Sequence, residues 1–299
     1  MRDKLQSSGD PSKNIQSFTD VKLNLLNCRY WKLELWDCHD MAFPFWRIYW
    51  NKNSGGVLRH NFMTYDMSPD KVYVVAPFTS FSTKYVKNHF YKKGIHVAGS
   101  QVKKHDNETT VQRSLLHLFI HFKLGIPFDN VFPGIFEIKM TPYLLINLEY
   151  LTNRLKTENR KFYATYTLKL QSIVNDILSN IGPELFKTLN VDYRILNVIR
   201  HIENHIEGKP TNSDLAEIAN MAPNSFSRLF KQKMNMTLHN YIMKRKIAQS
   251  CDLFLHTNQS ISEVAHNIGF SDRYHFSRVF KMITGSSPAV YKSFKAVLK

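Results

Sequence analysis

The last hundred residues contain a repeat that constrains the fold of this chain more than any other feature. Residues 213–219 begin with Ser, an acid, an apolar residue and Ala, and residues 262–268 follow the same pattern 49 positions later. Residues 226–231 (FSRLFK) and 276–281 (FSRVFK) repeat at a distance of 50 positions. Each copy fits a short helix that Ser213 or Ser262 could N-cap, a tight turn and a second helix anchored by two Phe side chains. The repeat therefore predicts two helix-turn-helix units.

The segment between the two units adds a geometric argument. Residues 238–255 carry apolar side chains at helical spacing together with a basic run at 244–246. A helix of about 20 residues is about 30 Å long, and one turn of B-DNA is about 34 Å. A linker helix of this length could hold two recognition helices in successive major grooves on one face of the duplex.

Residues 269–281 (GFSDRYHFSRVFK) and 285–292 (GSSPAVYK) closely resemble the signature of AraC/XylS-type transcription regulators, and the resemblance covers about 193–297. Small departures occur at Asn235, where the family often has Gly, and at Lys246 and Ser250, where it often has Arg and Ala. The resemblance implies base contacts from the first half of each second helix, by Asn224, Ser225, Ser227, Arg228, Arg273, Tyr274, His275, Ser277 and Arg278. Phosphate contacts are expected from Lys231, Lys244, Arg245, Lys246 and Lys281.

Charge and cysteine content agree with a DNA-binding protein. The formal net charge is +16, and residues 193–299 carry half of it in little more than a third of the chain, which favours an anionic partner. Three widely spaced cysteines exclude a disulfide framework or a four-cysteine zinc site. With neither a signal peptide nor an apolar run of membrane-spanning length, a soluble cytoplasmic protein with no membrane partner is expected.

The first two thirds of the chain change from strand-like to helical patterns near residue 140. Short aromatic and β-branched runs, such as 46–50, 71–75 and 116–122, alternate with turn signals over residues 20–138, which predicts a sandwich or small barrel. Residues 139–185 then place apolar side chains at helical spacing after an N-cap at Thr141. They predict a helical hairpin that packs on the barrel or forms a dimer interface. Residues 1–19 are expected to be a flexible arm.

The predicted fold class is therefore α+β: an N-terminal cupin-like β-barrel with a helical hairpin, then an all-α DNA-binding domain over residues 192–299. By the family resemblance, the barrel binds a small-molecule effector, expected to be sugar-like, and the hairpin forms a homodimer. Double-stranded DNA is the main expected partner, and RNA polymerase is a further candidate. The candidate effector-pocket residues are Trp46, Arg47, Trp50, His117 and His121.

Two other classes of protein remain open at this point. A metal-dependent cupin enzyme is one, because His117 and His121 share one face of a strand. The chain has no His-x-His pair, however, so no enzymatic activity, metal or cofactor is expected. A non-specific architectural DNA binder is the other; it would have the same basic charge but would not need two matched recognition helices.

Overall fold

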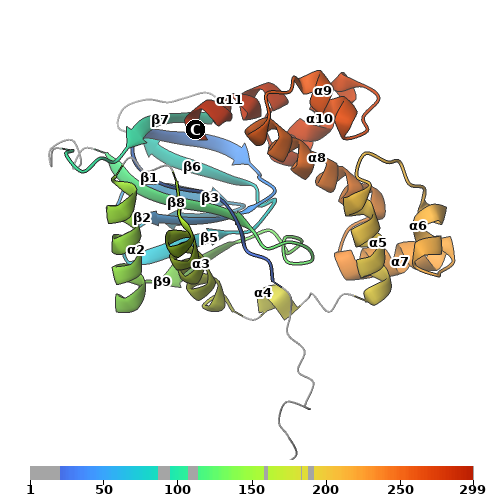
Figure 1. Ribbon diagram of the computed structural model, residues 1–299, viewed down its shortest axis with the longest axis horizontal. Coiled ribbons are helices and arrows are strands. Elements are labelled where there is room, and N and C mark those ends of the chain that lie inside the picture. The colour runs from blue at the N-terminus through green and yellow to red at the C-terminus, as the bar shows by residue number, and fades with distance from the viewer. Residues whose placement is uncertain are drawn as a thin grey trace, which may run out of the picture.

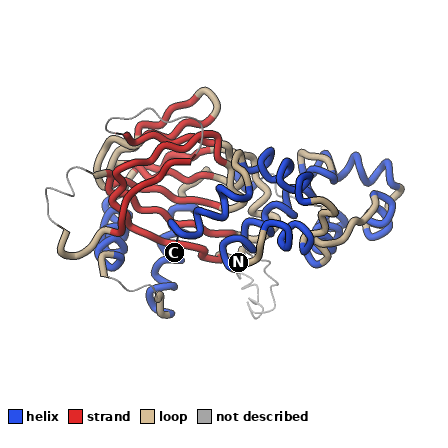
Figure 2. The backbone as a smooth tube through the Cα atoms, turned by 90° about the horizontal axis from the view of Figure 1, so that it is seen from above, coloured by secondary structure: helices blue, strands red, loops and turns tan. Residues whose placement is uncertain are grey.

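The computed structural model describes residues 21–86, 95–106, 114–157, 161–182, 184–187 and 192–298. The predicted arm over residues 1–19 lies outside these ranges, and so do residues 158–160 within the predicted hairpin. A strand-rich half is followed by a helical half, and the two lie side by side (Figures 1 and 2). None of the helices in these ranges is long and apolar enough to cross a membrane.

Antiparallel strands of the N-terminal half form one curved sheet in the order β4-β3-β6-β1-β8-β2-β5-β9, and β7 pairs with β1. Strand β1 is 18 residues long and bends, so that it pairs with β8 near its start and with β6 near its end. The sheet thereby curls into a half-barrel. The strands are β1 (Asn24–Met41), β2 (Trp46–Asn51), β3 (Val57–His60), β4 (Met63–Asp66), β5 (Lys71–Val75), β6 (Phe81–Val86), β7 (Ile95–Gln101), β8 (Leu115–Lys123) and β9 (Ile135–Lys139).

Successive side chains of a strand point to opposite faces of the sheet, and in β2 both faces are buried. On the outer face, Trp46, Ile48 and Trp50 of β2 join a large apolar core with two helices. These are α2 (Pro142–Leu155) and α3 (Ala164–Ser179), and the short α4 (Glu184–Lys187) follows them. On the inner face, Tyr49 packs with Trp36 and Phe81 inside the half-barrel.

The predicted helical hairpin thus packs on the sheet. The side chain of Thr141 accepts a hydrogen bond from the backbone N–H of Leu144 at 3.1 Å, which confirms the predicted N-cap. The apolar face of α2 is buried through Leu144, Leu148 and Leu151. Packing on the half-barrel therefore occupies the inner face of this helix and leaves its outer face for another partner.

The C-terminal half contains two helix-turn-helix units joined by a long helix. Its helices are α5 (Tyr193–Asn204), α6 (Asn212–Ile218), α7 (Pro223–Met234), α8 (Leu238–His256), α9 (Ile261–Asn267), α10 (Arg273–Thr284) and α11 (Pro288–Leu298). One core holds α5, α6, α7 and the start of α8, and a second holds the rest of α8 with α9, α10 and α11. Asn235 ends α7 at a φ of 52°, so Asn adopts the left-handed conformation at the position where the family often has Gly.

The short helices α6 and α9 begin earlier than predicted. Their N-caps are Thr211 and Ser260, not Ser213 and Ser262. Each forms a capping box, in which the cap side chain accepts from the backbone N–H three residues on, and the acid at that position, Asp214 for α6, accepts from the N-cap N–H. The acid at the third helical position makes this start more stable than the one proposed from the serines.

The two halves of the molecule meet through both side chains and backbone. The backbone N–H of Ala42, just after β1, donates to the carbonyl of Thr284 at the end of α10. The next residue, Gly285, has a φ of 78°, and a Cβ built on it would lie 1.7 Å from the carbonyl oxygen of Asp40. Lys123 of β8 forms an ion pair with Asp252 of α8. Close backbone contact therefore seats the second helix-turn-helix unit on the end of the half-barrel.

Candidate DNA-binding surface and effector pocket

Helices α7 and α10 present their predicted contact residues to solvent. Each helix is anchored by a pair of Phe side chains with no exposed surface, at positions 226 and 230 in α7 and 276 and 280 in α10. The opposite faces carry the exposed candidates Asn224, Ser225, Arg228, Lys231, Arg273, Tyr274, His275, Arg278 and Lys281, with Ser227 and Ser277 half-buried. The surface that these residues form is called the reading surface below.

Local hydrogen bonds fix the start of each second helix. Asp272 caps α10 by accepting from the backbone N–H groups of Tyr274 at 2.9 Å and His275 at 2.8 Å, and these bonds lower the pKa of the Asp272 carboxyl. In α7, the Ser227 hydroxyl lies 3.0 Å from the carbonyl oxygen of Pro223 and 3.1 Å from Oδ1 of Asn212. The Ser227 proton is therefore already engaged inside the first unit.

The three basic residues of the linker helix occupy other roles than the predicted phosphate contacts. Arg245 forms a two-bond ion pair with Glu203, with both N–O distances at 2.6 Å. Lys246 is 2% exposed and donates to the carbonyl of Gly208 at 3.0 Å. Lys244 is half-buried with its ammonium 5.0 Å from the ring centre of Phe78 in the half-barrel. In this arrangement the structure does not offer these three cations to DNA, because each one is engaged inside the molecule.

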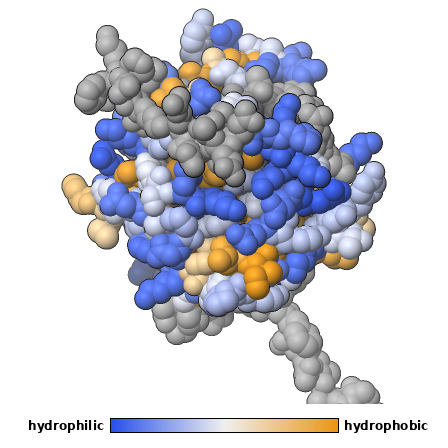
Figure 3. All heavy atoms as spheres, turned by 90° about the vertical axis from the view of Figure 1, so that its left-hand side faces the viewer, coloured by the Kyte–Doolittle hydropathy of each residue, from blue (hydrophilic) through white to orange (hydrophobic). Residues whose placement is uncertain are grey.

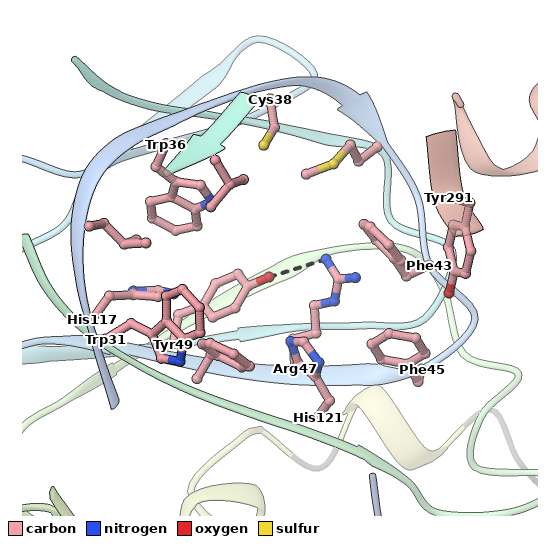
Figure 4. A pocket seen from close by; sticks show the side chains of 14 residues that line it. Trp31, Trp36, Cys38, Phe43, Phe45, Arg47, Tyr49, His117, His121 and Tyr291 are labelled. Atoms are coloured by element: carbon pink, nitrogen blue, oxygen red, sulfur yellow. Dashed lines mark hydrogen bonds between the residues drawn. The ribbon is translucent and has the colours of Figure 1, made fainter. Parts of the chain in front are cut away.

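The half-barrel encloses an apolar cavity of about 90 Å³. Its wall is largely aromatic, with sulfur atoms from Cys38 and Met41 and one charged side chain, Arg47 (Figure 4). Tyr291 of α11 lies at one end of the cavity and is the residue of the C-terminal half that lines it. The cavity is lined by Trp31, Leu33, Trp36, Cys38, Met41, Phe43, Phe45, Arg47, Tyr49, Val97, His117, Phe119, His121 and Tyr291.

The guanidinium of Arg47 is an unusual group in this position. It is 3% exposed, and within the described residues the structure pairs it with no carboxylate. It donates to the Tyr49 hydroxyl at 3.1 Å and stacks on Phe43, with Cζ 3.3 Å from the ring centre. Its Nε has no hydrogen-bond partner, and neither has Nε1 of Trp31. Two unpaired donors therefore remain buried at the cavity, each at a cost in free energy.

The two histidines of the cavity wall, unlike Arg47, carry no positive charge near pH 7. Burial lowers the pKa of His117 to about 3, and Nδ1 of its ring lies 2.7 Å from Oδ1 of Asn51. Burial and then the neighbouring charge of Arg47 lower the pKa of His121 well below its usual value. Both imidazoles are therefore neutral near pH 7, and Arg47 is the cation of the cavity. Among the residues that the structure describes, no three metal-ligating side chains lie close enough together to hold a metal ion.

The structure brings together only part of the predicted effector pocket. Arg47, His117 and His121 line the cavity, whereas Trp46 and Trp50 lie on the opposite face of β2 against the helices. Side chains alternate between the two faces of a strand, so the sequence alone already places Arg47 on the face opposite Trp46 and Trp50. Trp31 and Trp36 come from β1, whose bend has no clear sequence signal, and Tyr291 comes from the other half of the molecule.

Comparisons with known proteins agree with this architecture. Residues 215–293 match a family described as a helix-turn-helix domain. The probable transcriptional regulator LumQ of Photobacterium leiognathi is 30% identical over 147 residues, 48% of this chain and 59% of that protein. The arabinose operon regulatory protein of Escherichia coli (strain K12) is 31% identical over 106 residues, 34% of this chain and 36% of its own length. This chain thus spans less than two thirds of these two relatives.

Solved structures extend the likeness to both halves. ToxT from Vibrio cholerae O395 aligns with 94% of this chain and 98% of its own, at a TM-score of 0.57 and 12% identity. ToxT from strain SCE256 of that species, solved with a bound unsaturated fatty acid, aligns over the same shares at a TM-score of 0.56 and 13% identity. At such low identity the likeness concerns the fold, and it confirms the predicted α+β class of a curved antiparallel sheet followed by a helical domain.

The burial of Arg47 generates a prediction about stability. Replacement of a buried ion pair by apolar side chains of similar volume is often neutral or stabilising by about 1–4 kcal/mol, and a buried cation without a carboxylate partner has less favourable energy to lose. We expect Arg47→Met to leave the free energy of unfolding of the ligand-free chain unchanged or raise it within that range, as measured by urea denaturation. The control, Arg154→Met, removes an Arg that stacks on Tyr166 of α3, and should cost less than about 1 kcal/mol. A clear loss of stability in Arg47→Met would contradict the view that this charge is kept for a ligand.

Proposed function

We propose that this chain, a member of the AraC/XylS-type family through its C-terminal domain, is a sequence-specific DNA-binding transcription regulator controlled by a small molecule. The observation that carries the proposal is the presence of two helix-turn-helix units on one continuous helix, each with an exposed polar or basic recognition helix. A non-specific binder needs positive charge but not two matched helices. DNA recognition by both α7 and α10 follows from that pairing.

The reading surface divides into two kinds of contact. Arg228 and Arg278 suit guanine, and Asn224 suits adenine, because these side chains form paired hydrogen bonds with those bases in the major groove. Lys231 and Lys281 lie one turn further along α7 and α10 and suit phosphates. The engaged hydroxyl of Ser227 makes it the weakest candidate for a base contact. No phosphate contact is proposed for Lys244, Arg245 or Lys246 of the linker helix.

For the effector, the chemistry of the cavity favours an apolar carboxylic acid. A carboxylate has acceptors for the unpaired donors of Arg47 and Trp31, and the remaining wall is apolar. A sugar, the class expected from the sequence, would instead bury several hydroxyl groups with few partners. The fatty-acid complex of the related fold points the same way. A cavity of about 90 Å³, smaller than the ~150 Å³ cavity that holds benzene in an engineered protein, suits a short-chain acid.

Control of DNA binding requires a chain of contacts between the effector cavity and the second helix-turn-helix unit. Arg47 stacks on Phe43, and the Phe43 ring centre lies 5.6 Å from that of Tyr291. Tyr291 in turn packs on Phe280 of α10 at 5.4 Å. An acid that draws Arg47 away from Phe43 would change the surface on which α11 rests. The effector would therefore alter DNA affinity through the position of the second unit.

Homodimer formation through the hairpin is a further part of the proposal. The outer face of α2 exposes Tyr143, Ile146 and Tyr150 at helical spacing, with exposed fractions of 59%, 66% and 46%, and the side of the molecule that carries α2 shows an apolar patch (Figure 3). Contiguous exposed apolar surface often marks a protein interface. Ile146→Asp should convert a dimer to a monomer in sedimentation equilibrium, whereas Thr64→Asp, which adds the same charge at an exposed position of β4, should not. A wild-type chain that sediments as a monomer would refute the dimer alone.

Base reading by α10 is tested by two substitutions one turn apart. Arg278→Ala should cost about 1–3 kcal/mol on the cognate site and flatten discrimination at one base pair. Lys281→Ala should weaken all sequences alike and lower the salt slope of binding by about one. Fluorescence anisotropy on a set of single-base variants at several salt concentrations measures both. Equal behaviour of the two variants on every sequence would remove Arg278 from the set of base contacts.

The effector class is tested by thermal shift on the full chain. A ligand of the folded state at 100 times its dissociation constant should stabilise it by roughly 2.7 kcal/mol. We expect stabilisation by a short-chain acid, none by the corresponding amide, and loss of the effect in Arg47→Met. Stabilisation by a member of a sugar panel, retained in Arg47→Met, would overturn the acid and restore the sugar-like effector.

A further inference from the structure

The two helix-turn-helix units meet directly at a junction beside helix α8. Tyr241 and Ile242 of this helix are buried in the core of the first unit, and Ile247 is buried in the core of the second. Met243 contacts both cores. The changeover from one core to the other therefore occurs between positions 243 and 247 of a single continuous helix.

Lys246 lies at this changeover, with its side chain pointing inward. The ammonium donates to the carbonyl oxygen of Gly208, in the loop that follows α5 of the first unit, at 3.0 Å. It also lies 5.9 Å from the ring centre of Phe270, in the turn of the second unit. Burial lowers the pKa of this ammonium. One side chain on α8 therefore contacts a loop of the first unit and the turn of the second.

The backbone of the two units also meets at this point. Gly269 has a φ of 78°, and a Cβ built there would lie 2.0 Å from the carbonyl oxygen of Glu207 and 2.8 Å from Nζ of Lys246. The turn of the second unit therefore approaches the loop after α5 too closely for any side chain. The equivalent turn of the first unit uses Asn220 at a φ of 51°, which shows that the conformation alone does not require Gly. The close contact at the junction is what requires Gly at position 269.

We propose that Lys246 is a positioning residue that fixes the separation and angle of α7 and α10, and thereby the spacing of the two DNA subsites that the protein accepts. The inference rests on the proposed function, since it presumes that both helices read DNA. Each added base pair moves a subsite by about 3.4 Å along the duplex and turns it by about 35°. A junction locked by Lys246 cannot follow such a change, whereas a loosened junction can.

Two simpler roles of Lys246 give different results. A phosphate contact, the role predicted from the sequence, would make Lys246→Met weaken binding equally at every spacing. A contribution to stability alone would lower the melting temperature without altering the preference among spacings. Spacing preference is therefore the measurement that separates positioning from both.

The test uses the full chain and DNA probes that carry both subsites at the native separation or with one base pair added or removed between them. For the wild type we expect a loss of about tenfold or more in affinity when the spacing changes, comparable to a mismatch in the site. Lys246→Met keeps the aliphatic stem and should reduce this difference severalfold. Lys246→Arg keeps a donor to the Gly208 carbonyl and should restore it. Lys244→Met, the matched loss of charge on the same helix, should keep the wild-type preference.

Failure of the positioning role and failure of the proposed function give different results. A wild type without sequence preference in DNA binding would refute the proposed function itself. A wild type that reads its site, with Lys246→Met showing the same spacing preference at lower affinity or stability, would overturn the positioning role. Circular dichroism verifies that each variant is folded. If Lys246→Met does not fold, Lys246→Gln takes its place under the same criterion.

Discussion

Helix α8 has to satisfy two hydrophobic cores at once, and the positions of both recognition helices depend on it. Its first turns complete the core around Phe226 and Phe230, and its later turns complete the core around Phe276 and Phe280. At 19 residues it is about 28 Å long, somewhat shorter than one turn of DNA. Polar side chains of α8 also bind other parts of the molecule. Arg245 pairs with Glu203 of α5, and Asp252 pairs with Lys123 of the half-barrel.

The second constraint is the uncompensated charge of Arg47. A guanidinium without a carboxylate partner is normally excluded from an apolar interior, so its presence is most easily understood as part of a binding site whose ligand completes it. Because Phe43 lies between Arg47 and Tyr291, the site is partly built by the domain that it would regulate. A ligand can shift the molecule from one arrangement to another only if it binds the second arrangement more tightly than the first. In the proposed mechanism, that difference arises at the aromatic contacts of Tyr291.

The sequence predicted the helical half well and the pocket only in part, for identifiable physical reasons. The duplicated Phe pairs and turns report local structure, so both recognition helices could be assigned from the repeat. The basic run of the linker helix was misleading, because composition does not reveal which residues are buried. Lys246 follows Ile242 by four positions, which places it on the buried face, and this signal was overlooked. The bend of β1 and the arrival of Tyr291 depend on contacts distant in sequence, which no local pattern encodes.

The glycine that follows α10 limits how far the two halves of this protein can be exchanged with those of related proteins. Gly285 lies so close to the carbonyl of Asp40 that no side chain fits between them. A transplanted helical domain with any other residue there could not seat on this half-barrel in the same way. Under the proposed function, such a chimera would bind DNA as an independently tethered module and would lose its response to the ligand. Recombination that preserves regulation must therefore transfer both sides of this contact, the backbone at Asp40 and Gly285, together. The interface between the halves, and not the linker, sets where the chain can be divided.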